Sequence, residues 1–225
     1  MARRRKDDPA APELSPQRIV SAAIELIDLH GLEAFSLRGL ARHIEAGNMS
    51  VYYYFKDRDA LLAMVLDEIL GSISLKRLPA DPIDALATLS QRFVTAFVNH
   101  PGTIPLFVLR PLYSIGPHGQ QLFDRFVGLL RETGVADRTV ADTTVALIEY
   151  LCGHLIGHLP QVRHPHDNHG ATVDEMLQAL PDGAAPHLRA IGPALRRAAE
   201  DLRPTAGITL ILSGLTSQNT IGPKP

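Results

Sequence analysis

The chain has 225 residues, of which 45% are hydrophobic, and a formal net charge of −2 at neutral pH. This length allows a substantial core, in one large domain or in a small domain followed by a larger one, and the charge excludes a surface that is basic throughout. The single cysteine, Cys152, excludes an internal disulfide framework, and no apolar run approaches the roughly 18 residues of a membrane span. Because the N-terminus also lacks the apolar segment of a secretory signal, we expect a cytoplasmic protein with no membrane partner.

The first 14 residues contain a basic run, Arg3, Arg4, Arg5 and Lys6, followed by proline, alanine and acidic residues. Such a composition is typical of a solvated tail. Ahead of a DNA-binding module the same run can lie along phosphates or enter the minor groove, so order can arrive on binding. From Pro16 to His30 apolar residues recur at helical spacing, and Gly31 is suited to end that helix.

Residues 36–55 predict two short helices joined by a tight turn. Ser36 is a candidate N-cap for the first, and Gly47 in the break can adopt a positive φ. In the second helix Val51 and Phe55 can point inward. The groups left on its outer face are Asn48, Met49, Ser50, Tyr52 and Tyr53. A short, apolar-backed helix that presents amide, hydroxyl and phenol groups after a turn is what a helix-turn-helix offers to the major groove.

Several residues of this region resemble the DNA-binding signature of TetR-family transcriptional regulators, over about residues 15 to 66. They are Leu40, Ala41, Ala46, Val51, Tyr52, Phe55, Arg58, Ala60, Leu61 and Leu62. The family usually places glycine where this chain has Glu45, so we expect Gly47 to take the unusual φ instead.

The resemblance and the exposed face together imply which residues contact DNA. Arg38 occupies the position at which the tetracycline repressor reads guanine with an arginine. The expected base-reading residues are Arg38, Asn48, Met49, Ser50 and Tyr53. The expected phosphate-binding residues are Arg3, Arg4, Arg5, Ser36, Tyr52, Lys56 and Arg58.

Residues 59–76 predict a long helix, and a second helix is expected over 82–99. The resemblance to TetR-family regulators implies that the first of these connects the DNA-binding domain to a regulatory body. Residues 100–117 are irregular and contain four prolines. This pattern fits a broken helix packed on the core, and it equally fits a concave ligand site. The candidate wall residues are Phe97, Phe107, Arg110, Tyr113, Phe126, Tyr150 and His154, with Arg110 able to pair an anionic group.

Further helices are expected over 118–133, 137–158, 172–180, 185–202 and 204–215. The segment 137–158 is apolar over much of its circumference, so it requires cover on more than one side. It resembles, with 204–216, the helices that form the dimer bundle in TetR-like proteins. The expected fold is therefore all-α, with a helix-turn-helix domain at 1–58 and an effector-binding and dimerisation domain at 59–225.

Five histidines lie between positions 154 and 169: His154, His158, His164, His166 and His169. The first two are spaced to share one helical face and could hold a metal, but no HExxH pattern or second cysteine accompanies them. We therefore expect no metal or cofactor and no enzymatic activity. The leading hypothesis is a homodimeric repressor that binds double-stranded operator DNA and is released by a small, mainly apolar effector. The alternative is a metal-dependent enzyme that uses the histidine-rich segment.

Overall fold

The computed structural model describes residues 14–109, 116–157, 169–181, 183–200 and 205–220. Within these ranges the chain forms eleven α-helices and one 3-10 turn, and no strand. This confirms the all-α class. Among the same residues, no helix combines the length and the apolar character needed to cross a membrane.

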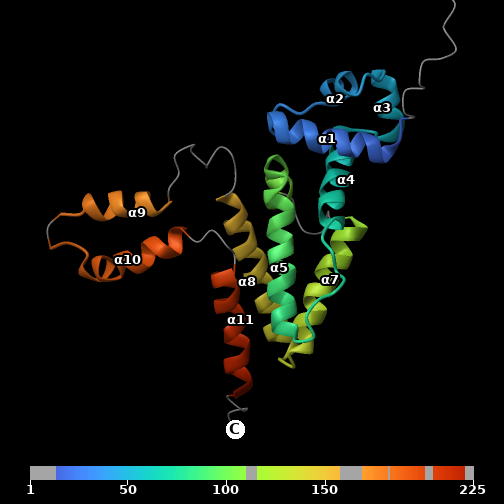
Figure 1. Ribbon diagram of the computed structural model, residues 1–225. Coiled ribbons are helices and arrows are strands. Elements are labelled where there is room, and N and C mark those ends of the chain that lie inside the picture. The colour runs from blue at the N-terminus through green and yellow to red at the C-terminus, as the bar shows by residue number, and fades with distance from the viewer. Residues whose placement is uncertain (1–13, 110–115, 158–168, 182, 201–204, 221–225) are drawn as a thin grey trace, which may run out of the picture.

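Three helices at the N-terminal end form a compact unit, which we call the reader (Figure 1). They are α1 (Pro16–His30), α2 (Leu37–His43) and α3 (Asn48–Tyr54). Serines begin the first two, because the Ser15 side chain accepts a hydrogen bond from the Arg18 N–H and the Ser36 side chain accepts one from the Gly39 N–H. Fully buried apolar side chains join the three helices. They include Ile19, Ala23, Ile27, Leu40 and Val51.

The turn between α2 and α3 differs from the expectation. Glu45 has the positive φ, at 53°, whereas Gly47 has an ordinary φ of −67°. The hydrogen bonds explain why: the Ala46 N–H donates to the Ala41 carbonyl at 2.9 Å, and the Glu45 N–H donates to the Arg42 carbonyl at 3.2 Å. This is a Schellman ending, in which the residue after the C-cap takes the left-handed conformation. The prediction that Gly47 takes the unusual φ was therefore wrong.

Helix α4 (Arg58–Gly71) leaves the reader and enters the body of the protein. Its N-cap, Asp57, accepts a hydrogen bond from the Ala60 N–H at 2.7 Å. The helix ends five residues before the expected Lys76, and the chain that follows is held by Arg92, whose guanidinium donates to the carbonyls of Ser74 and Lys76. Helix α4 packs on both α1 and α7, so it connects the reader directly to the body.

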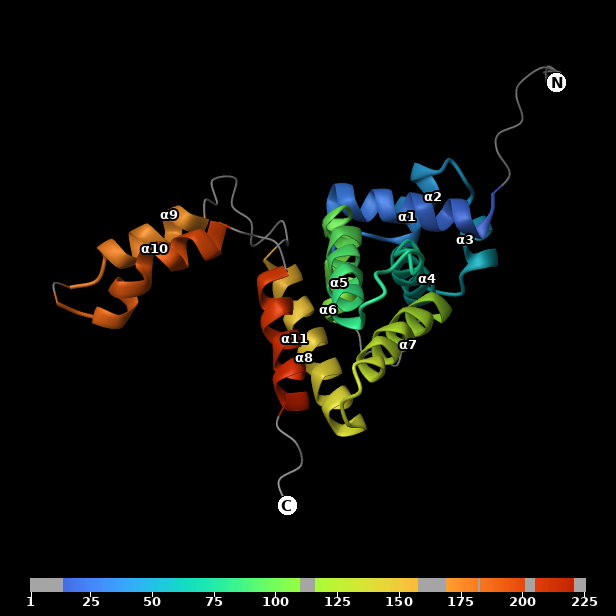
Figure 2. The ribbon, with the colours of Figure 1, turned by 60° about the horizontal axis from the view of Figure 1, so that its bottom comes forward.

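The body is a bundle in which α5, α8 and α11 lie side by side and α7 packs against α4, α5 and α8 (Figures 1 and 2). Its elements are α5 (Pro82–Val98), η1 (Pro101–Thr103), α6 (Ile104–Val108), α7 (Pro117–Glu132), α8 (Asp137–Ile156) and α11 (Thr205–Thr220). Helices α9 (His169–Gln178) and α10 (Pro186–Glu200) pack on each other as a hairpin. In both views this hairpin stands apart from the bundle.

Helix boundaries within the body agree with the expected ones to within a few residues. The largest differences are that α9 begins three residues early and that α11 extends to Thr220 rather than ending at Leu215. Residue 158, the expected end of α8, lies outside the described residues. The division of the chain into domains at residues 58 and 59 stays a prediction.

Candidate DNA-binding surface and effector pocket

The outer face of α3 is exposed, as its sequence pattern predicts. Met49 is 80% exposed and Tyr53 is 84% exposed, while Val51 and Phe55 on the opposite side are buried. Ser50 and Tyr52 are exposed as well. The apolar side chains of α3 therefore pack against the rest of the reader, while a thioether, a hydroxyl and two phenols face outward. These groups suit contacts with base edges and phosphates in a groove of DNA.

The remaining expected contact residues surround this face. Arg38, Ser36 and Lys56 are exposed, although the Ser36 oxygen also caps α2. The Tyr54 hydroxyl donates to the Leu14 carbonyl at 2.8 Å, which fixes the start of the described chain beside α3. A shallow depression of about 450 Å³ lies at this junction, lined by Leu14, Met49, Ser50, Tyr53 and Tyr54. Arg3, Arg4 and Arg5 lie outside the described residues, as does the side chain of Asn48.

Arg58, one of the expected phosphate contacts, makes hydrogen bonds within the protein. Its Nε donates to the Phe35 carbonyl at 3.2 Å and its Nη2 donates to the Leu32 carbonyl at 2.8 Å. The guanidinium also lies over the Phe35 ring, 5.9 Å from the ring centroid. Arg58 thus fastens the first turn of α4 to the segment between α1 and α2. Two of its three guanidinium nitrogens are engaged in this way, and its contact with phosphate stays a prediction.

An aromatic cluster occupies the middle of the body, where the sequence predicts a pocket. The Phe93, Phe97 and Phe107 rings contact one another at centroid distances of 5.0 to 5.3 Å. Phe107 and Phe123 are nearly parallel, with an interplanar angle of 7° and centroids 6.3 Å apart. A small cavity of about 10 Å³ lies within this cluster, lined by Phe93, Phe107, Phe123, Phe126, Leu130, Thr144, Leu147, Ile148 and Leu151.

This cavity is far smaller than the ~300–1,000 Å³ of a typical ligand site, so the pocket is closed in this structure. The lining is apolar apart from Thr144, whose hydroxyl donates to the Val140 carbonyl at 2.8 Å. Of the wall residues expected from the sequence, Phe107 and Phe126 line this cavity, and their role in ligand binding stays a prediction. Sequence reasoning missed Phe93, Phe123 and the α8 residues, although their three- and four-residue spacing marks them as an inward face.

The other expected wall residues do not line the cavity. Phe97 is buried behind Phe93 and Phe107, and Arg110 and Tyr113 lie outside the described residues. Tyr150 and His154 stack on each other with ring centroids 6.1 Å apart. They lie at the boundary between α8 and α11, where a Cβ added to Gly207 would collide with the Tyr150 ring. The residues predicted to form one pocket wall therefore lie in two separate places, the aromatic cluster and the boundary between α8 and α11.

The local environment raises two pKa values near this boundary. Burial raises the pKa of Tyr150, and a backbone hydrogen bond with Gly207 partly opposes that shift. Burial also raises the pKa of the Cys152 thiol, with a smaller contribution from the charge of Glu149. Neither group therefore gains charge easily.

The histidine-rich segment is described only in part. His158, His164 and His166 lie outside the described residues, and so does the side chain of His169. His154 is engaged with Tyr150, and within the described part of the chain no three potential metal ligands come together.

Comparison with known proteins now identifies the family. A family model described as "Bacterial regulatory proteins, tetR family" matches residues 19–65, and one described as "Tetracyclin repressor-like, C-terminal domain" matches residues 78–219. The chain belongs to the TetR family. The first match covers the reader and most of α4, and the second covers the aromatic cluster and both helices proposed for the dimer.

Individual TetR-family relatives are distant. The chain is 27% identical over 147 residues to the HTH-type transcriptional repressor DrrR1 of Streptomyces coeruleorubidus, a match covering 63% of this chain and 53% of that protein. It is 28% identical over 152 residues to an HTH-type transcriptional regulator of Saccharopolyspora erythraea, covering 66% of this chain and 62% of the relative. The chain thus matches only about half to three-fifths of the length of these relatives.

Solved TetR-family structures show the same fold. ActR of Streptomyces coelicolor, in complex with actinorhodin, superposes with a TM-score of 0.77 and 24% identity, over 92% of this chain and 98% of that one. A variant of TetR from Acinetobacter baumannii, in complex with minocycline, superposes with a TM-score of 0.66 and 16% identity, over 94% and 98% of the two chains.

Proposed function

We propose that this TetR-family protein is a homodimeric DNA-binding repressor whose operator affinity falls when a small aromatic molecule enters the body. The observation that carries the proposal is the outer face of α3, where Met49, Ser50 and Tyr53 are exposed on a helix anchored from behind by Val51. A short helix that presents such groups after a tight turn is the element that a helix-turn-helix places in the major groove of DNA. DNA binding, rather than catalysis, is the function we assign, and the cytoplasm is the compartment that it requires.

Dimerisation is proposed through α8 and α11. Leu210 is 74% exposed and Val145 is 54% exposed, and a depression of about 280 Å³ runs between the two helices. Ala146, Ile211 and Leu215 line it. Joining this surface to its copy would bury the exposed Val145 and Leu210. It would also place two readers on one face of a duplex, roughly 34–36 Å apart or a multiple of that distance.

Selection of DNA fragments by the purified protein tests the central proposal. We expect enrichment of a two-fold symmetric site, bound more tightly than random duplex by a factor of about 10³ or more. Sedimentation at micromolar concentration should show a dimer. A monomer, or equal affinity for selected and random duplexes, would contradict the proposal.

The effector is proposed to be a flat, mainly apolar molecule with one polar or anionic group. The support is the lining of the closed cavity, in which four phenylalanine rings meet, Phe93, Phe107, Phe123 and Phe126. ActR and the TetR variant were solved with actinorhodin and minocycline, respectively, which fits this class of ligand. A flat ligand could enter by parting the parallel Phe107 and Phe123 rings.

The absence of tryptophan from the sequence allows a clean binding assay. Phe123→Trp would place the sole tryptophan at the cavity, where a bound aromatic ring quenches its emission. We expect anthraquinone-2-sulfonate and anthracene-9-carboxylate to quench it, and decanoate, a flexible aliphatic acid, to bind more weakly. Tighter binding of decanoate would contradict the proposed ligand class.

A further inference from the structure

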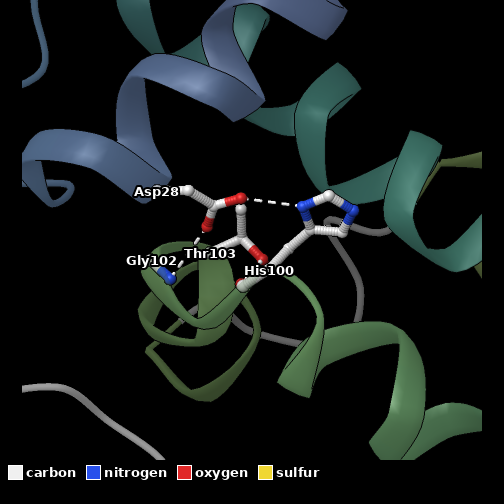
Figure 3. A network of polar contacts seen from close by, with 4 residues as sticks. All are labelled: Asp28, His100, Gly102 and Thr103. Carbon is white, nitrogen blue, oxygen red and sulfur yellow. Dashed lines mark hydrogen bonds and ion pairs between the residues drawn. The ribbon is translucent and has the colours of Figure 1, made fainter.

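Two aspartates connect the reader and α4 to the body in the same way. Asp28, near the end of α1, accepts a hydrogen bond from the His100 Nδ1 at 2.7 Å and another from the Gly102 N–H at 3.0 Å (Figure 3). Asp67, in α4, accepts one from the Gly119 N–H at 3.0 Å and lies 3.1 Å from the His118 Nδ1. We call these the α1 clamp and the α4 clamp. Each joins one carboxylate to one imidazole and one backbone N–H.

Each aspartate supplies a cap that the body element lacks. Neither η1 nor α7 receives a hydrogen bond from the side chain of its own N-cap residue, because His100 makes none there and Gly116 has no side chain. The first N–H groups of a helix need acceptors, and a carboxylate is favoured there by the helix dipole. Asp28 provides an acceptor from α1 of the reader, and Asp67 provides one from α4.

Close packing makes both clamps stiff. A Cβ on Gly102 would collide with the Ile27 backbone in α1, and a Cβ on Gly116 would collide with the Asp67 carboxylate. The Asp67 side chain is only 4% exposed, so its charge is held in a place where loss of its partners would be costly. His118 also packs on Gly71, one helical turn beyond Asp67 on α4. The first turn of α7 therefore contacts α4 at two positions that are one helical turn apart.

Each clamp lies just before a segment of the chain that lines the cavity. The α1 clamp immediately precedes α6, which carries Phe107, and the α4 clamp opens α7, which carries Phe123 and Phe126. These are the rings that close the cavity. A molecule that parts Phe107 from Phe123 pushes on α6 and α7, and each of these elements is fastened at its beginning to the reader or to α4.

We propose that the two clamps carry the effector signal from the aromatic cavity to the reader, with Asp28 and Asp67 as positioning residues; this rests on the proposed function. The α4 clamp turns displacement of α7 into a tilt of α4, and the α1 clamp makes the reader follow. With both clamps intact, the cavity can open only if the reader changes its orientation. With a clamp broken, the cavity opens locally and the reader keeps its place.

A double-mutant cycle tests this without a known effector, because a side chain can take the place of one. Thr144→Phe overfills the cavity of about 10 Å³ and pushes on the same rings. Thr95→Phe is the matched control, since Thr95 is exposed on α5 and its hydroxyl donates to the carbonyl four residues earlier, as that of Thr144 does. Thr144→Leu is the milder substitution should the phenylalanine prevent folding.

Each cavity variant is combined with Asp67→Ala, which breaks the α4 clamp, and with Glu68→Ala as the control on the exposed side of the same helix. His118→Ala removes the imidazole alone and gives a second, gentler break. Affinity for the selected duplex is measured by fluorescence anisotropy. In the parent we expect Thr144→Phe to weaken operator binding by about 5-fold or more. In the Asp67→Ala background the same change should have an effect below about 2-fold.

Equal fold-changes in the parent and in Asp67→Ala would overturn the clamp proposal while leaving the repressor function standing. If no duplex is selected at all, the repressor function fails and the clamps are still tested by amide hydrogen exchange. There, Thr144→Phe should speed exchange in α4 in the parent and in Glu68→Ala, but not in Asp67→Ala. Faster α4 exchange in all three backgrounds, or in none, would overturn the clamp proposal on that readout.

Discussion

The left-handed conformation of Glu45 makes a quantitative prediction. Its φ of 53° is imposed by the Schellman ending of α2, and a residue with a Cβ pays about 1–2 kcal/mol to adopt it. Glycine adopts it without that strain but loses about 0.4–1 kcal/mol more conformational entropy on folding. The midpoints of these two ranges differ by about 0.8 kcal/mol, so Glu45→Gly should raise the free energy of unfolding by about 0.5–1 kcal/mol.

Side-chain contacts do not complicate this estimate. Glu45 is exposed, and its side chain makes no hydrogen bond or ion pair with any residue in the described ranges. Urea unfolding at fixed protein concentration measures the change, which corresponds to a rise of about 1–4 °C in Tm for a chain of this size. The concentration has to be fixed because the stability of a dimer depends on it.

Glu45→Ala is the control that isolates the backbone. Alanine removes the carboxylate but keeps the Cβ, so the strain remains and stability should change by less than about 0.5 kcal/mol. If Glu45→Gly is no more stable than Glu45→Ala, the strain argument is wrong. If both gain equally, the relevant factor is the negative charge rather than the φ angle.

Three further predictions concern the reader and α8. Arg38→Ala should cost about 1–3 kcal/mol of binding free energy on the selected operator and relax the preference at one base pair. Lys56→Ala should instead weaken binding to all duplexes alike and reduce the slope of log affinity against log salt concentration by about 1. Equal losses on selected and random DNA for both variants would contradict this division into base and phosphate contacts. Because burial and the Glu149 charge raise the pKa of Cys152, iodoacetamide should alkylate this thiol more slowly at pH 8 than a free thiol. Glu149→Gln should speed the alkylation, and an unchanged rate would refute the role of the charge. Because the pKa of Tyr150 is raised on folding, the folded state keeps a proton that the unfolded state releases, so the free energy of unfolding should fall as the pH rises above about 10. Tyr150→Phe should make that fall shallower, and an unchanged slope would count against the assignment.

Local chemistry accounts for what could be predicted from the sequence. Helical spacing of apolar residues placed the helices, and Ser36 marks a helix start because a short oxygen-bearing side chain can satisfy the first N–H groups. The exposed face of α3 followed from the inward spacing of Val51 and Phe55. Each of these inferences uses residues a few positions apart.

Contacts between distant residues account for most of what could not be predicted. Asp28 and Asp67 are isolated carboxylates in the sequence, and their partners lie 74 and 52 residues away at Gly102 and Gly119. The internal hydrogen bonds of Arg58 could not be predicted either, because its partner carbonyls lie 26 and 23 residues earlier in the chain. The sequence does carry one faint signal, since a helix that begins at Gly116 without a capping side chain requires an acceptor from elsewhere.

The closed cavity sets the energy scale of the proposed response. A fused aromatic molecule that buries about 150–250 Å² of apolar surface gains about 4–6 kcal/mol. Part of this gain is lost in separating Phe107 from Phe123, which are in contact in the closed form. A ligand shifts an equilibrium only by its differential affinity for the two states, and weakening operator binding 5- to 150-fold requires about 1–3 kcal/mol. Burial can therefore support both opening and signalling, provided the clamps make opening and reader movement one event. If the cavity were already open, the same ligand would bind more tightly yet signal less, because it would no longer distinguish the two states.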